Sequence, residues 1–279
     1  MDRTLLLKEL LFKYTPERIT QCITKLKENP MDISSAKTVL YYYFLNERLN
    51  TKIMNTNFYE FYDNFDTIIT LSRPYILNVF NKMNYKRNAQ GIYRIYRLYY
   101  GSCSPFKIST AYSLIQKYAF DKNIILDPCA GFGGRCIATL LHNKKYIGFD
   151  INDRLEHSYN SLLSHFNNNN YNIQFVDCLN VDYSTIKYDC VFTSPPYYNT
   201  ELYNNTEKRS KKEWNIWYRT VFTTIYNNLM DNGIMILSIN QQMYNKVFNL
   251  IFGDAIEIIP MELNKRNSIY KEYVYIWRK

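Results

Sequence analysis

The feature that most constrains this chain is a stretch of 75 residues, 124–198, with a polar turn near each end. The first turn, residues 127–135, reads Asp-Pro-Cys-Ala-Gly-Phe-Gly-Gly-Arg and follows a short apolar run. The second, residues 193–198, reads Thr-Ser-Pro-Pro-Tyr-Tyr and follows another apolar run. Glycines between a strand and a helix let the backbone approach a ligand closely. In an open α/β sheet both turns lie at the carboxyl edge, where ligands bind.

Two acidic residues fall at predicted strand ends between these turns. A strand over residues 146–149 ends at Asp150, and one over residues 173–176 ends at Asp177. Asp150 follows Asp127 by 23 positions, a spacing that suits hydrogen bonds to ribose hydroxyls. Asp177 is placed to read an adenine amino group. We therefore expect the first turn and these carboxylates to hold a nucleoside-containing cofactor.

The second turn follows a predicted strand over residues 189–192 and is rich in hydrogen-bond acceptors. Its two prolines fix φ and remove two backbone donors, leaving carbonyl oxygens and the Ser194 hydroxyl. Acceptors beside an aromatic ring are what an exocyclic amino group of a base needs. We predict that Ser194, Pro195, Pro196 and Tyr197 are catalytic, with Tyr197 stacking on the base.

The remaining segments complete an α/β domain preceded by helices. We predict a helical N-terminal domain over residues 1–88 and a catalytic domain over residues 89–279. The helices include one opened by Thr15 and Pro16, one over residues 58–71 and one opened by Pro74. Further strands over residues 234–239, 255–259 and 272–277, with a helix over 242–251, predict a seven-stranded, mostly parallel sheet with helices on both faces.

Several residues outside the turns are candidates for substrate contacts. Arg94 and Arg97 alternate with tyrosines, as on surfaces that bind phosphates and stack on bases; a linker helix with a solvated basic face is the alternative. The polar loop over residues 199–213 is expected to cover the crevice. Within and beside it, Tyr198, Glu201 and Tyr203 could contact substrate, although a lid without direct contact fits equally well. Both Trp214 and Trp217 are expected to pack in the core.

Composition limits the classes of partner. The net charge of +9 suits a polyanion such as nucleic acid, although a lysine-rich surface from AT-rich coding gives the same excess. Six scattered cysteines and three histidines, without a Cys-x-x-Cys pair, predict no metal site and an intracellular setting. No apolar run is long enough to span a bilayer, so no membrane partner is expected.

Residues 104–279 resemble the class I S-adenosylmethionine-dependent methyltransferases, and among them the DNA amino-methyltransferases. Residues 127–133 are similar to the cofactor loop of that family, Asp-Pro-x-x-Gly-x-Gly, and residues 194–197 to its catalytic (Asp/Asn/Ser)-Pro-Pro-(Tyr/Phe/Trp) motif. The longer strings look like methyltransferases of phages and large DNA viruses. The resemblance implies S-adenosylmethionine as cofactor and assigns its binding to the following residues: Phe106, Asp127, Pro128, Ala130, Gly131, Gly133, Asp150 and Asp177.

The resemblance also implies the reaction. A base flips out of DNA, and its amino nitrogen accepts the methyl group without a metal or a covalent intermediate. Serine at the first motif position favours N4 of cytosine slightly over N6 of adenine. An RNA or tRNA substrate and a non-catalytic nucleic-acid-binding subunit remain as alternatives, whereas the missing Gly-x-Gly-x-x-Gly disfavours a nicotinamide enzyme. The loop after Tyr198 is short, so target recognition falls to the N-terminal helices, a partner subunit or a homodimer, or is relaxed.

Overall fold

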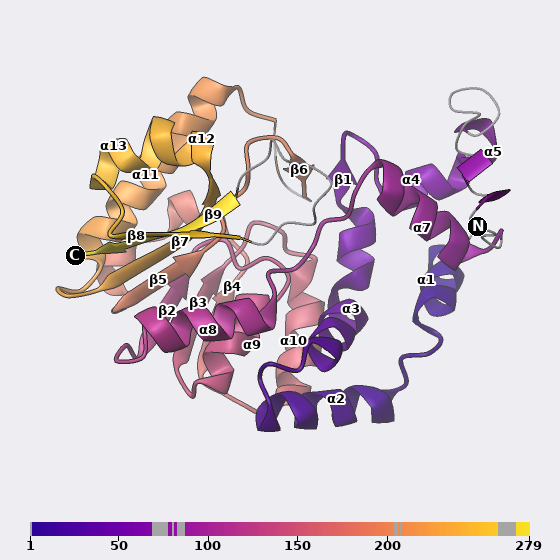
Figure 1. The fold of residues 1–279 in the computed structure, drawn as a ribbon, viewed down its shortest axis with the longest axis horizontal. Helices are drawn as coiled ribbons and strands as arrows, with labels where there is room; N and C mark the ends of the chain where they lie inside the picture. The colour runs from indigo at the N-terminus through magenta and orange to yellow at the C-terminus, as the bar shows by residue number, and fades with distance from the viewer. Residues whose placement is uncertain are drawn as a thin grey trace.

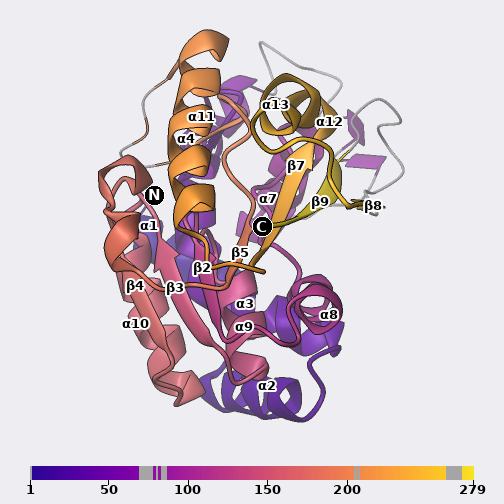
Figure 2. The same cartoon turned by 90° about the vertical axis from the view of Figure 1, so that its left-hand side faces the viewer.

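A seven-stranded sheet forms the centre of the computed structural model, with helices on both faces (Figures 1 and 2). The structure describes residues 2–68, 78–79, 81–82, 87–203, 206, 208–261 and 272–279. The strands lie in the order β4-β3-β2-β5-β7-β9-β8. Their bounds are β2 (Ile124–Asp127), β3 (Lys145–Phe149), β4 (Tyr171–Gln174), β5 (Cys190–Thr193), β7 (Ile234–Asn240), β8 (Glu257–Pro260) and β9 (Glu272–Arg278).

The strand directions place the two turns together. Strands β4, β3, β2, β5 and β7 are parallel neighbours, and β9 is antiparallel to both β7 and β8. From β2 the chain builds the sheet outward to β4 and then returns to place β5 on the other side of β2. The order thus reverses between β2 and β5, and a crevice forms outside their carboxyl ends. The predicted fold class, a Rossmann-like methyltransferase sheet with an N-terminal helical region, is confirmed.

Several predicted element boundaries differ from the structure; the strand predicted over residues 255–259, for example, begins at Glu257. Strand β4 begins and ends two residues before the predicted range, because its last residue, Gln174, already pairs with Phe149 at the end of β3. The helix predicted over residues 242–251 is three consecutive segments. These are α12 (Gln241–Met243), the π-helix η4 (Tyr244–Phe248) and α13 (Asn249–Phe252).

Alternating residues of the strands pack into two separate hydrophobic cores, one on each face of the sheet. Ile125 packs with α8 (Ile108–Tyr118), α9 (Gly134–Leu141) and α10 (Leu155–Phe166). Its neighbour Leu126 packs with α11 (Lys211–Asn228), η4 and the short turns η2 (Cys178–Asn180) and η3 (Tyr183–Thr185). Successive side chains of a strand point to opposite faces, so the central strands are mostly apolar on both faces, with Asp127, Thr193 and Ser238 as buried polar exceptions.

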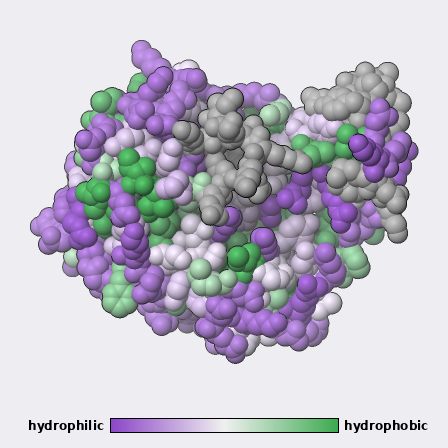
Figure 3. Space-filling model, viewed as in Figure 1, coloured by the Kyte–Doolittle hydropathy of each residue, from purple (hydrophilic) through white to green (hydrophobic). Residues whose placement is uncertain are grey.

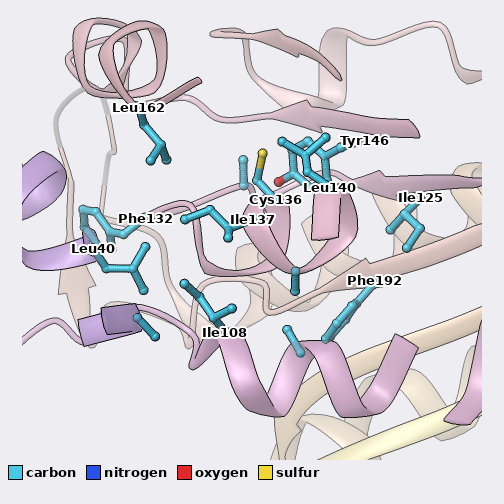
Figure 4. Packing of buried hydrophobic residues seen from close by; sticks show 14 of the residues in the cluster. Leu40, Ile108, Ile125, Phe132, Cys136, Ile137, Leu140, Tyr146, Leu162 and Phe192 are labelled. Carbon is cyan, nitrogen blue, oxygen red and sulfur yellow. The ribbon is translucent and has the colours of Figure 1, made fainter. Parts of the chain in front are cut away.

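The N-terminal helices divide between two packing clusters. Helices α2 (Pro16–Glu28) and α3 (Ile33–Asn50) share the core of α8, α9 and α10, and Figure 4 shows Leu40 of α3 in that cluster with Phe132 of the glycine-rich turn. Helices α1 (Arg3–Leu11), α4 (Phe58–Asp63), α5 (Phe65–Thr67) and α7 (Ala89–Tyr99) form a third cluster, at the right of Figure 1. Because α7 packs with helices from before residue 88, the proposed boundary at 88 falls within this cluster.

The helix predicted over residues 58–71 ends early. Asn57 caps α4 in a capping box with Glu60, and the helix stops at Asp63 before the short α5. Residues 69–71 and the start predicted at Pro74 lie outside the described residues. Thr15 caps α2 with Pro16 in the first turn, as its sequence predicts.

A small second sheet joins the N-terminal region to the loop after the Ser-Pro-Pro-Tyr turn. Strand β1 (Lys52–Ile53) pairs antiparallel with β6 (Glu201–Leu202), with Ile53 opposite Glu201. The loop expected to cover the crevice is therefore tied to the segment that follows α3. Neither strand can be predicted from the sequence, because two residues are too few to show the alternation of apolar and polar residues that is typical of a strand.

The surface seen in Figure 3 is mainly hydrophilic, with hydrophobic side chains in small patches. None of the helices that the structure describes combines the length and apolarity required to cross a bilayer.

Candidate active site

A cavity of about 720 Å³ opens at the carboxyl edge of the sheet and is lined by both turns. Its volume is within the range of pockets that hold small-molecule ligands. Ten of the predicted site residues line it: Phe106, Pro128, Gly131, Asp150, Asp177, Ser194, Pro195, Pro196, Tyr197 and Tyr203. The structure thus brings the glycine-rich turn, Asp150 after β3 and the Ser-Pro-Pro-Tyr turn to one cavity. Asp177 also lines it, but it caps η2 three residues after the end of β4 and is not at the strand end that the sequence predicted.

Six other predicted residues do not line the cavity: Asp127, Ala130, Gly133, Tyr198, Arg94 and Arg97. The side chain of Glu201 lies outside what the structure describes. Asp127 is fully buried and receives hydrogen bonds from Arg135 Nε (2.7 Å) and the Tyr146 hydroxyl (2.9 Å). Its carboxylate therefore holds the turn and the start of α9 in place and does not face a ligand.

The glycines of the first turn are required by close contacts. Gly133 has φ +77°, and a Cβ there would lie 2.7 Å from the Phe44 ring of α3. A Cβ on Gly134 would lie 1.9 Å from the Phe106 carbonyl oxygen, so the turn containing Phe106 lies directly against the first turn of α9. Arg48 of α3 also donates from Nε to the Cys103 carbonyl (2.7 Å). The N-terminal region therefore supports two walls of the cavity.

Asp150 is fixed by backbone donors. Its Oδ2 accepts from the Gly131 N–H (2.7 Å), and its Oδ1 accepts from the Asn152 N–H (2.9 Å). Burial raises the pKa of Asp150 to about 6, although these two hydrogen bonds lower it. The carboxylate thus faces the cavity in one orientation, set by the glycine-rich turn.

The Tyr197 hydroxyl is the centre of a hydrogen-bond network at the second turn. It lies 3.1 Å from Ser194 Oγ, 3.0 Å from the Ser238 carbonyl oxygen and 2.5 Å from Glu272 Oε1. Burial and the neighbouring Glu272 carboxylate raise the pKa of the Tyr197 phenol well above its ordinary value. The network fixes the ring at the cavity wall.

Tyr218 of α11 holds the same turn from the opposite side. Its hydroxyl donates to the Pro196 carbonyl (2.6 Å) and accepts from the Tyr198 N–H (3.0 Å). Tyr198 has φ +53°, and its own hydroxyl donates to Asn215 Oδ1 (3.3 Å). Tyr198 therefore shapes the turn while its side chain is directed to α11.

Both tryptophans of α11 are buried, as expected, but they also line the cavity. Trp214 Nε1 donates to Asn199 Oδ1 (2.9 Å), and the Arg209 guanidinium lies 5.0 Å from the Trp214 ring centre. The buried Trp217 Nε1 has no hydrogen-bond partner in the described structure. This N–H is enclosed by protein and does not open into the cavity, so Trp217 contributes to the cavity wall by other atoms of its ring.

Glu272 lines the cavity and has no local sequence signal. It is the first residue of β9 and pairs with Asn240, the last residue of β7. Because β9 runs antiparallel to β7, its first residue lies at the carboxyl edge of the parallel strands. Only the sheet order could have revealed this position. By contrast, the capping box of Ser210 and Glu213 shows in the sequence that α11 begins before Trp214.

The tyrosines next to Arg94 and Arg97 are not available for stacking on bases. Tyr93 and Tyr96 are buried in the cluster of α1, α4 and α7. The two arginines are on the exposed side of α7. This segment is an amphipathic helix with a basic face, and its role in binding phosphates stays a prediction.

Among the described residues, no group of three or more His, Cys, Asp or Glu side chains is placed to hold a metal ion.

The fold and the cavity define a Rossmann-like methyltransferase architecture. Residues 188–278 match the sequence model of the family described as DNA methylase (N6_N4_Mtase). The match covers about a third of the chain and contains both the Ser-Pro-Pro-Tyr turn and Glu272. The expected resemblance to DNA methylases is thereby confirmed over these residues, while the likeness to phage and viral proteins stays a prediction. No curated protein sequence matches the chain at a significant level.

Solved structures with a similar fold include three methyltransferases. An rRNA methylase from Streptococcus thermophilus is 12% identical, with a TM-score of 0.45 over 63% of this chain and 98% of that one. TrmN from Thermus thermophilus is 13% identical, with a TM-score of 0.49 over 62% and 48%. SMU.1697c, a methyltransferase from Streptococcus mutans in complex with SAH, is 13% identical, with a TM-score of 0.43 over 63% and 100%. This chain spans about half of TrmN, and these likenesses are too distant to indicate a substrate.

Proposed function

We propose that this chain is an S-adenosylmethionine-dependent DNA methyltransferase that acts on an exocyclic amino group of a base. The observation that carries the proposal is the placement of the Ser-Pro-Pro-Tyr turn and the Asp150 carboxylate on one cavity. The DNA methylase match over residues 188–278 supports the substrate class.

The cavity residues fit the proposed cofactor. The Asp150 carboxylate is available for ribose hydroxyls, and Asp177 lines the cavity where the adenine amino group is expected. Gly131 and the turn that contains Phe106 form the cavity wall near the first turn of α9. The backbone N–H groups at the start of α9 favour the carboxylate of the S-adenosylmethionine cofactor. When bound, S-adenosylmethionine supplies a methyl group activated by a positively charged sulfur.

The second turn positions the amino group. Tyr197 stacks on the flipped base, and Ser194 Oγ and the Pro195 carbonyl accept hydrogen bonds from the amino hydrogens. These bonds direct the nitrogen lone pair at the methyl group, so catalysis comes mainly from orientation. Because Ser194 is at the first motif position, we favour N4 of cytosine slightly over N6 of adenine.

Cations at the cavity mouth suit the phosphates of the substrate. Lys107 and Arg209 line the cavity, and the net charge of the chain is +9. We propose that these two residues contact the backbone beside the flipped nucleotide, with Arg94 and Arg97 on α7 as additional contacts.

The test is transfer of labelled methyl groups from S-adenosylmethionine to DNA and to RNA, with Ser194→Ala as the inactive variant. Ser113→Ala, an exposed serine on α8, is the control and should behave as wild type. Label in DNA that is lost only with Ser194→Ala supports the proposal. Label in RNA alone would assign an RNA substrate, and no label in either, with no cofactor binding, would overturn the proposal.

A further inference from the structure

We propose, on the basis of the function proposed above, that Glu272 orients the Ser194 hydroxyl through Tyr197 and accepts the proton released by methyl transfer. The geometry is a continuous chain of three side chains. Ser194 Oγ is 3.1 Å from the Tyr197 oxygen, which is 2.5 Å from Glu272 Oε1. All three residues line the cavity, so the chain begins at the proposed position of the amino group.

The donor and acceptor of each hydrogen bond among Ser194, Tyr197 and Glu272 follow from counting the protons that these groups carry. An ionised carboxylate only accepts, and Glu272 Oε1 at 2.5 Å is a nearer and stronger acceptor for the Tyr197 phenolic proton than the Ser238 carbonyl oxygen at 3.0 Å. Glu272 also accepts the Ser238 hydroxyl proton (3.1 Å). Tyr197 has then used its one proton, and its oxygen can only accept from Ser194. Ser194 in turn has used its proton, so its free lone pairs face the cavity. Glu272 thereby makes Ser194 an acceptor, which is what an amino group requires.

The electrostatic setting of Glu272 suits a proton acceptor. Within the described residues, no Lys or Arg forms an ion pair with the Glu272 carboxylate. A distance of 2.5 Å is typical of a charge-assisted O–H···O⁻ hydrogen bond. The negative charge of the Glu272 carboxylate therefore lies at one end of the three hydrogen-bonded side chains, and the nitrogen that becomes positive lies at the other end.

The proton balance is complete with these groups. The N–C bond forms as the C–S bond breaks, with its electron pair staying on sulfur, and the nitrogen gains a positive charge. The nitrogen then gives a proton to Ser194, Ser194 gives its own to Tyr197, and Tyr197 gives its own to Glu272. The products are a neutral methylated amine and a carboxylic acid, which loses its proton to solvent through the cavity.

The test combines two variants that break the chain at different links. Tyr197→Phe keeps the ring but removes the relay oxygen, and Glu272→Gln keeps the shape but removes the charge. We expect each to lower the single-turnover rate of methyl transfer about 100-fold, with S-adenosylhomocysteine Kd changed by less than about twofold. The double variant should be no slower than either single variant, because both break the same chain.

A spectroscopic readout tests the network without turnover. A strongly downfield proton resonance from the Tyr197–Glu272 bond should be present in the wild type and absent in both variants. Glu257→Gln, on the exposed edge of β8, is the matched control and should keep wild-type rate and resonance. If Glu272→Gln does not fold, Tyr197→Phe alone decides the question.

Two outcomes would overturn this proposal while leaving the proposed function intact. One is a Glu272→Gln or Tyr197→Phe rate within about twofold of wild type, and the other is a multiplicative loss in the double variant. Absence of transfer by the wild type would instead overturn the proposed function itself.

Discussion

Arg135 and Asp127 form an ion pair inside the protein, with Nε 2.7 Å from Oδ2 and side chains that are 5% and 0% exposed. Arg135 also donates from Nη2 to the Cys129 carbonyl, so one guanidinium joins the end of β2, the turn and α9. The first acidic residue of the cofactor loop is thus part of the scaffold of that loop.

Removing Asp127 should therefore destabilise the fold strongly. Asp127→Ala leaves the Arg135 charge buried without a partner, and we expect a loss of about 3–5 kcal/mol in the free energy of unfolding. Asp66→Ala is the matched control, because both partners of its ion pair with Arg87 are exposed, at 74% and 63%. We expect that change to cost less than about 1 kcal/mol in urea unfolding followed by circular dichroism. Equal losses would contradict the scaffold role.

The contact between Phe44 and Gly133 predicts a steric effect beyond that of backbone strain. Gly133 (φ +77°) and Gly101 (φ +84°) both have a positive φ, but only Gly133 has the Phe44 ring against it, and a Cβ on Gly101 would meet open space. An alanine at either position carries a strain of about 1–2 kcal/mol. Gly133→Ala should lower the free energy of unfolding clearly more than Gly101→Ala and should also weaken S-adenosylhomocysteine binding in calorimetry. Similar stability and affinity for the two variants would show that α3 does not press on the loop.

The raised pKa of Asp150 predicts the sign of a pH dependence. Its pKa is about 6 in the folded chain against an ordinary value of 3.8, so the folded state binds the proton more tightly. The free energy of unfolding therefore falls as the pH rises from 3.8 to about 6, because burying the ionised carboxylate is unfavourable. Asp150→Asn should lose this component, so the variant gains stability relative to wild type between the two values. A difference between variant and wild type that does not change with pH would rule this out.

The two tryptophans of α11 predict different effects of the same substitution. Trp217 Nε1 has no partner, whereas Trp214 Nε1 already donates to Asn199. Both changes to phenylalanine remove a similar ring volume, but only Trp214→Phe removes a hydrogen bond that is made. Trp214→Phe should therefore lower the free energy of unfolding by about 1 kcal/mol more than Trp217→Phe, measured by urea unfolding. A larger loss for Trp217→Phe would contradict this.

The parts of the site that depend on local pattern were predictable. Strands ending in a glycine-rich turn and in a Pro-Pro turn are short-range signals, and parallel pairing places their ends at one edge. Asp150 and Ser194 line the cavity for that reason.

The remaining parts depend on contacts between distant residues. Glu272 reaches the cavity only because β9 pairs antiparallel with β7. The support of the glycine-rich turn by Phe44 and the pairing of β1 with β6 join segments about 90 or more positions apart in the chain. Hydrophobic periodicity identifies helices such as α3 but does not show which surface they cover.

The identity of the methylated nucleoside tests the central claim most directly. Wild-type chain, DNA and labelled S-adenosylmethionine would be incubated, and the DNA digested to nucleosides and analysed by mass spectrometry. The account predicts a methyl group on an exocyclic nitrogen, as N4-methylcytosine or N6-methyladenine. A methyl group on a ring carbon, a ring nitrogen or an oxygen would contradict it, because the Ser194 and Pro195 acceptors would then have no amino group to hold.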